Sequence, residues 1–73
     1  MERDEAEALA WYEQAAEGGH GRAAATASFM YAFGQGAAED HEAAAEYFHL
    51  AYDCGYDPFL LFDAMGVDPP FEF

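Results

Sequence analysis

The residues that most resemble a metal-binding site lie between positions 42 and 53. Glu46 and His49 have the i, i+3 spacing of the Glu-x-x-His pairs that hold metal in di-iron helix bundles. With Glu42 and Asp53 they form one stripe of an expected helix, at i, i+4, i+7 and i+11. A di-iron site needs a second such pair and further glutamates from other helices, and only this pair lies within an expected helix. We therefore expect a solvated acidic face, with no metal and no other cofactor.

The remaining reactive side chains do not form a recognised catalytic motif. His20 falls in an expected turn, and Ser28 stands where a small packing residue is expected. Cys54 directly precedes a glycine that ends a helix, where cysteine is more often a small buried side chain than a nucleophile. The glycines at 18–21 and 34–36 lack the spacing and the lysine of phosphate-binding loops. We expect no catalytic residues and no enzymatic activity.

The net charge is −13, because fifteen Asp and Glu residues face only two basic residues, Arg3 and Arg22. Direct binding to nucleic acid or to an anionic membrane is disfavoured, since both need basic patches. A protein partner with a basic surface is the natural complement. The alternative is that the acidity serves only solubility or adaptation to salt. The partner-binding acidic face that we expect contains Glu13, Glu17, Glu39, Glu42, Glu46, His49 and Asp53.

The single cysteine and the acidic N-terminus indicate the compartment. Cys54 has no second thiol for an internal disulfide, which fits a reducing cytoplasm. The first five residues, Met-Glu-Arg-Asp-Glu, do not resemble a secretory signal. No apolar run approaches the roughly 18 residues that a transmembrane helix needs. We expect a soluble, cytoplasmic protein with no membrane contact.

The chain repeats one pattern with a period of thirty-six residues. The stretch from Asp40 to Gly55 matches the stretch from Asp4 to Gly19. The paired positions are Asp4 and Asp40, Ala8 and Ala44, Trp11 and Tyr47, Tyr12 and Phe48, Ala15 and Ala51, and Gly19 and Gly55. A fixed period of this size is typical of helical-hairpin repeats, in which each unit buries its apolar face by stacking on a neighbour.

Local signals predict four helices in one domain spanning residues 1–73. The expected helices cover about 5–17, 23–33, 41–54 and 58–65, followed by a tail over 66–73. Asp4 has the spacing of a capping box with Glu7, and Asp57 precedes a proline at a first helical position. The segment from His20 to Arg22 is expected as a turn, and Gly34 ends the second helix. The first helix should bury Ala8, Trp11, Tyr12 and Ala15.

These residues together resemble a known family. The pattern is Asp4-x3-Ala8-x2-Trp11-Tyr12-x2-Ala15-Ala16-x2-Gly19-x3-Ala23, followed by Met30-Tyr31-x2-Gly34-x-Gly36. It is similar to the Sel-one-like repeats, relatives of the tetratricopeptide repeats, over about residues 4–55. The resemblance implies a short α/α solenoid of one and a half to two repeats that binds other proteins and carries no chemistry of its own.

Fewer than two full repeats are present, although such solenoids usually need about three units. We therefore expect the apolar fourth helix and the C-terminal tail to cap the open end, or two chains to pair there as a homodimer. Aromatic residues dominate interface hot spots. Those expected to anchor a partner at this end are Phe59, Phe62, Phe71 and Phe73.

Two hypotheses of function follow. One is a non-enzymatic inhibitor or modulator whose carboxylates occupy a basic, nucleic-acid-binding surface of a target, as in the nucleic-acid mimics among phage anti-CRISPR proteins. That likeness is one of composition only. The other is an adaptor that docks a partner through its apolar concave face or its C-terminal aromatics, with the acidity serving solubility alone.

Overall fold

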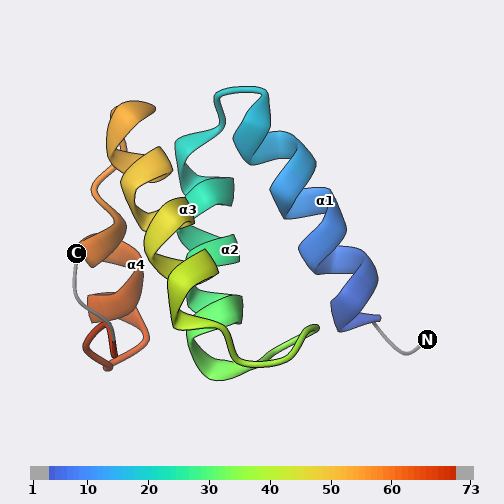
Figure 1. The fold of residues 1–73 in the computed structure, drawn as a ribbon. Helices are drawn as coiled ribbons and strands as arrows, with labels where there is room; N and C mark the ends of the chain where they lie inside the picture. Colours follow the sequence, from blue (N-terminus) through green and yellow to red (C-terminus); the bar gives the residue numbers. More distant parts are fainter. Residues whose placement is uncertain (1–3, 71–73) are drawn as a thin grey trace.

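A computed structural model describes residues 4–70, which contain four helices and no strand (Figure 1). The helices are α1 (Glu5–Glu17), α2 (Gly21–Phe33), α3 (His41–Asp53) and α4 (Pro58–Ala64). This confirms the all-α class and the short solenoid expected from the sequence. The third and fourth helices each end one residue earlier than expected, because Cys54 and Met65 are their C-caps.

Carboxylate caps begin three of the four helices. Asp4, Asp40 and Asp57 each accept hydrogen bonds from backbone amides of the following first turn, at 3.0–3.3 Å. The first helical turn has amide groups without an intrahelical partner, and a short acidic side chain satisfies them. The starts of α1, α3 and α4 therefore follow from local sequence alone.

The start of α2 differs from the expectation. The helix begins at Gly21, so the predicted turn over residues 20–22 is wrong. His20 is the N-cap, and its Nδ1 accepts a hydrogen bond from the Ala23 amide at 3.1 Å. The imidazole nitrogen thus does the work that Asp or Ser does at other helix starts.

The thirty-six-residue period is present in the backbone as well as in the sequence. Gly19 and Gly55 occupy equivalent positions and have φ angles of 96° and 83°. After each of them, the next amide returns to an equivalent carbonyl: His20 donates to Ala15 at 3.0 Å, and Tyr56 donates to Ala51 at 2.9 Å. The helices α1 and α3 are therefore equivalent elements of a repeat, with the same start and the same end.

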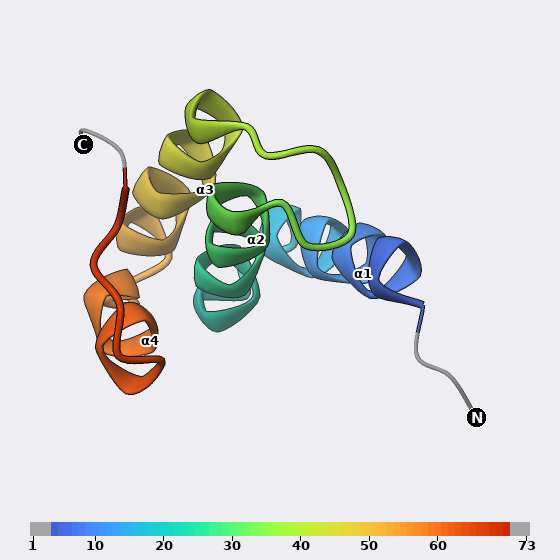
Figure 2. The same cartoon turned by 90° about the horizontal axis from the view of Figure 1, so that it is seen from below.

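The centre of the fold is α2, which packs against all three other helices (Figure 2). In Figure 2 it lies between α1 on one side and α3 and α4 on the other. Small side chains on its surface let several helices approach closely, since the distance between helix axes depends on the side chains at the contact. Its buried residues are Ala23, Ala24, Ala25, Ala27, Ser28, Met30 and Ala32.

The buried face of α1 is only partly the one expected, since Tyr12 is half-buried and packs against the core cluster that contains Leu9. Leu9 and Ala16 are its buried residues, whereas the side chain of Trp11 is 61% exposed. Ala8 and Ala15, expected beside Trp11 in the core, are half-buried. In the described chain α1 contacts only α2 and α3, and both lie on the side of Leu9 and Ala16. Trp11 is therefore a surface residue, and the prediction that it would be buried is wrong.

The loop from α2 to α3 passes close to the start of α1 (Figure 2). Gly36 lies in this loop with a φ of 79°, and a Cβ placed on it would lie 2.5 Å from the carbonyl oxygen of Glu5. Glycine is therefore required here twice over, by the left-handed backbone and by the close approach.

We expect Gly36→Ala to destabilise the fold more than Gly55→Ala. Gly55 also has a positive φ, but nothing lies within 4 Å of a Cβ placed on it. Its replacement should cost only the backbone strain, about 1–2 kcal/mol. At Gly36 the contact with α1 adds overpacking of about 1–3 kcal/mol. Urea unfolding of both variants measures the difference, and equal losses would show that the loop yields without cost.

Candidate functional site

The acidic stripe expected on the third helix lies on the surface of α3. Glu42, Glu46, His49 and Asp53 are all exposed, and we call these four residues the α3 acidic face. The opposite side of the helix is buried against α2 and α4 through Ala44, Phe48 and Ala51. The amphipathic arrangement keeps the carboxylates in water, where charge costs little.

Glu13 does not lie freely outward as the sequence suggested. Its side chain is half-buried, and its Oε1 accepts a hydrogen bond from the Tyr31 hydroxyl at 2.5 Å. This bond joins α1 to α2 at the edge of their contact. Of the acids expected on the partner-binding face, Glu13 thus has a role inside the fold, whereas Glu17 is exposed.

Two tyrosines stack beside this hydrogen bond. The rings of Tyr31 and Tyr47 have centroids 5.8 Å apart and are nearly parallel, at 8°. The hydrogen bond to Glu13, followed by burial and the repulsion of nearby negative charge, raises the pKa of Tyr31 to about 12. Neutral tyrosine is the form that the folded protein favours there, because ionisation would place a phenolate beside a carboxylate.

The acids of α1 and α3 meet around Tyr47. Burial raises the pKa of Tyr47, and the charges of Glu13, Glu17 and Glu46 raise it further. Carboxylates from both helices therefore act on one hydroxyl, although about thirty residues of sequence separate them. Glu17 of α1 and Glu46 of α3 thus both lie near enough to Tyr47 for their charges to act on it, as does the half-buried Glu13.

Glu39 lies in the loop before α3. Its Oε2 is 3.4 Å from the His41 Nε2, and both side chains are exposed. An exposed pair of this kind contributes little to stability. Glu39 thus adds an accessible carboxylate near the N-terminal end of the α3 acidic face.

Residues 4–70 contain neither a metal-binding cluster nor a membrane-spanning helix. No group of three or more His, Cys, Asp or Glu side chains in this range could hold a metal ion. None of its helices is long and apolar enough to cross a membrane.

The aromatic residues expected to anchor a partner at the C-terminal end lie differently. Phe62 is only 1% exposed and packs in a core cluster with Ala32, Ala44 and Phe48, so it is not available to a partner. Phe59 is half-buried, and its ring lies 5.0 Å from that of Phe48. Phe71 and Phe73 lie outside the described residues.

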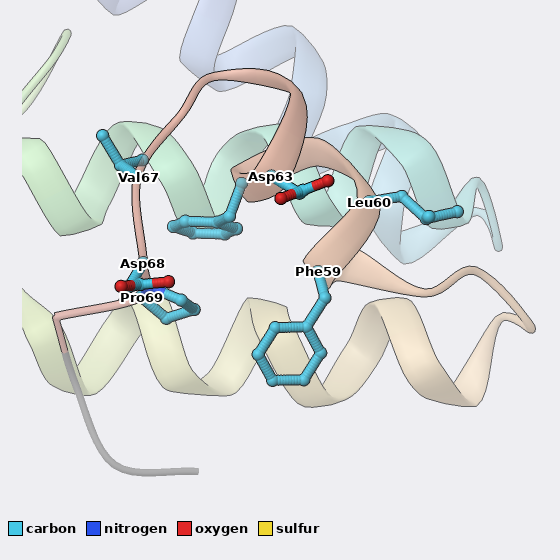
Figure 3. Close-up of a pocket in the computed structure, with 7 residues that line it drawn as sticks. Phe59, Leu60, Asp63, Val67, Asp68 and Pro69 are labelled. Carbon is cyan, nitrogen blue, oxygen red and sulfur yellow. The ribbon is translucent and has the colours of Figure 1, made fainter.

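The apolar surface at this end is formed instead by Leu60 and Met65, which are 60% and 56% exposed. Figure 3 shows Leu60 and Phe59 pointing in different directions from α4. A hollow of about 250 Å³ adjoins Leu60 and Phe59, whereas Met65 lies outside it. It is lined by Phe59, Leu60, Phe62, Asp63, Val67, Asp68 and Pro69. Because nearly every residue of α4 is apolar, the sequence alone could not show which of them would face outward.

The paired helices and their thirty-six-residue period place the chain in the class of helical repeat proteins. The Sel1 repeat family model matches residues 1–20 and 22–56, which is most of the chain. The chain belongs to the Sel1 repeat family, as the sequence pattern had indicated. Sel1 repeats typically mediate protein–protein interactions and are not enzymes. No curated protein and no solved structure matches the chain significantly.

We expect Tyr31 to make the fold sensitive to alkaline pH. Its folded pKa of about 12 lies above 10.0, the ordinary pKa of a tyrosine. The stabilisation is therefore complete below about pH 10 and is lost as the pH rises towards 12. Absorbance at 295 nm should show a late-ionising tyrosine that is absent from Tyr31→Phe and shifted to lower pH in Glu13→Gln.

The same variants test the stability of the contact. At neutral pH, Tyr31→Phe should lower the free energy of unfolding by about 1 kcal/mol, less than a fully buried charged hydrogen bond because water reaches the site. Between pH 8 and 11, the free energy of unfolding should decrease less with rising pH for this variant than for the unmodified chain. Identical pH dependence in both would contradict the assignment.

Proposed function

We propose that this chain is a non-enzymatic inhibitor or modulator whose carboxylates occupy a basic, nucleic-acid-binding surface of a target protein. Anti-CRISPR proteins of phages that mimic nucleic acid act in this general way. The proposed contact region is the α3 acidic face together with Glu13, Glu17 and Glu39. The interaction role of Sel1 repeats supports a protein as the partner.

The observation that carries the proposal is the meeting of acids from α1 and α3 around Tyr47. Charges scattered evenly over the surface would serve solubility equally well. A concentrated negative region, in a chain of net charge −13, attracts a basic surface and speeds the encounter. The acids that gather from two helices around Tyr47 therefore favour a binding role for at least part of the acidity.

The spacing of the carboxylates supports the same proposal. Glu42 and Glu46 are four residues apart on α3, and Asp53 follows seven residues later on the same exposed side. Side chains four residues apart on a helix have Cβ atoms about 5–6 Å apart. A row of negative groups at this spacing can face a groove that binds successive phosphates. The single cysteine, Cys54, is consistent with the reducing cytoplasm that the proposal assumes.

Charge reversal on α3 tests the proposal. We expect Glu42→Lys, Glu46→Lys and Asp53→Lys together to abolish capture of basic proteins from a host lysate by the immobilised chain. Nucleic acid should release the captured proteins, and affinity should fall about tenfold or more between roughly 50 and 200 mM salt. Circular dichroism checks that the variant keeps its helices.

The matched control reverses Glu5, Asp63 and Asp68, which are exposed and lie outside α3. Its net charge equals that of the α3 variant, and we expect it to retain capture. Equal loss in both variants would mean that only the total charge matters. Undiminished capture by the α3 variant would remove the α3 acidic face from the proposal.

A second candidate function is an adaptor that docks through the C-terminal end, which the exposed Leu60 beside the hollow favours. For this function we expect Leu60→Asp to abolish binding, with little effect of salt or of the α3 variant. Leu60 is a better probe than Phe59, because removing Phe59 would also remove its packing on Phe48. Sedimentation of the unmodified chain and of Leu60→Asp distinguishes the adaptor from two copies pairing at this end.

A further inference from the structure

The repeat reveals which face of α3 packs on the helix before it. Ser28 of α2 is fully buried, and its Oγ donates a hydrogen bond to the Ala44 carbonyl at 2.6 Å. Tyr47 stacks on Tyr31 of α2, and Ala51 lies in one buried cluster with residues of α2. Ala44, Tyr47 and Ala51 are thus among the residues through which α3 meets α2, together with Phe48, which shares a buried cluster with Ala32.

The equivalent residues of α1, thirty-six positions earlier, are each more exposed than their counterparts in α3. They are Ala8, Trp11 and Ala15, and we call them the outer face of α1. Trp11 is 61% exposed, while both alanines are only half-buried. In both views α1 forms one end of the row of helices (Figures 1 and 2). The face that is a helix–helix contact in α3 is therefore only partly covered in α1, where Ala8 also lines a hollow with Thr26 and Met30 of α2.

The border of this face is acidic. A hollow of about 310 Å³ is lined by Asp4, Glu7, Ala8 and Trp11. Asp4 and Glu7 are both exposed, so a cation placed in the hollow would meet two carboxylates. It would also lie near the indole of Trp11, and an indole ring attracts lysine or arginine through the cation–π interaction.

We propose that the outer face of α1 binds a helix of a basic protein partner, held in the position that α2 holds relative to α3. Small residues of that helix would pack on Ala8 and Ala15, and a lysine or arginine would lie between Trp11 and the carboxylates of Asp4 and Glu7. This deepens the proposed function and rests on it, because the partner is again a basic protein. It adds a second contact, on apolar surface, to the one at the α3 acidic face.

A second copy of the chain is a poorer occupant. The helix that could take the place of α2 in this contact is α4, which has only seven residues and carries Asp63. Bringing this end against Asp4 and Glu7 would place like charges together, and each copy has a net charge of −13. Charge complementarity therefore favours a basic helix.

The end of α2 shows where the basic residues of the partner belong. Asp40, the equivalent of Asp4, donates its amide to the Tyr31 carbonyl at 2.9 Å, near the C-terminal end of α2. A suitable probe is therefore a stapled helical peptide with the sequence of residues 21–33, followed by two lysines. A second peptide ending in two glutamates is its charge control.

Trp11 is the only tryptophan, so its emission reports directly on this face. We expect the lysine peptide to shift the Trp11 emission of the full chain to shorter wavelength in a saturable way, and the glutamate peptide to bind about tenfold more weakly or less. Ala15→Arg should weaken binding of the lysine peptide by a similar factor. Ala10→Arg carries the same charge change at an exposed position away from this face, and should leave the affinity within about twofold.

Several results would overturn the assignment. Equal binding of both peptides would show that the partner helix need not be basic. An emission that neither peptide changes would show that the face binds no helix. Equal loss in Ala15→Arg and Ala10→Arg would mean attraction by bulk charge alone; Ala8→Arg repeats this test if Ala15→Arg does not fold. An emission shift on concentrating the chain without peptide would assign the face to a second copy.

The proposed function is tested separately. Capture of basic proteins that depends on Glu42, Glu46 and Asp53 would support the α3 acidic face even if the peptide fails to bind. Peptide binding that survives reversal of these three charges would support the outer face of α1 as an independent site.

Discussion

The packing of three helices around α2 is the constraint on which the rest of the structure depends. A helix surrounded on several sides must carry small side chains, and α2 does so through its alanines. The one buried hydroxyl on it, that of Ser28, is satisfied by the Ala44 carbonyl. This bond ties the position of α3 along α2, because the hydroxyl would otherwise lose its hydrogen bond with water without replacement. The alignment of α3 along α2 is thus fixed by the hydrogen bond of Ser28, which is fully buried.

The charge of the protein is compatible with this core because the acids lie on helix faces that point away from α2. Glu13 is the exception, and its position at the edge of the α1–α2 contact is possible because Tyr31 donates a hydrogen bond to it. Self-repulsion at a net charge of −13 works against the compact state. The fold withstands that repulsion by burying alanine and aromatic surface around α2 and Phe48.

Comparison of α1 with α3 separates scaffold from candidate binding surface. The two helices share an aspartate cap and a glycine of positive φ at their ends. They differ in the acids, since Ala6 and Ala10 of α1 stand where α3 has Glu42 and Glu46. They also differ in exposure, since Tyr47 of α3 is half-buried and stacks on Tyr31, whereas its equivalent Trp11 is 61% exposed. The α3 acidic face lies where the equivalent helices diverge in sequence. The outer face of α1 instead uses the repeated positions Ala8, Trp11 and Ala15, and differs from α3 in how far these positions are covered.

The sequence by itself determined the helices, their caps, the repeat and the family, because these depend on hydrogen bonds and backbone angles within a few residues. Asp4, Asp40 and Asp57 show this directly. The sequence did not predict His20 as the N-cap of α2, because histidine is not among the residues that usually cap helices. Only the tertiary structure decided that Trp11 is exposed, that Phe62 is buried while Leu60 is not, and that Glu13 meets Tyr31. Periodicity places such residues on a helix face, but which face is covered depends on helices brought together from distant parts of the chain.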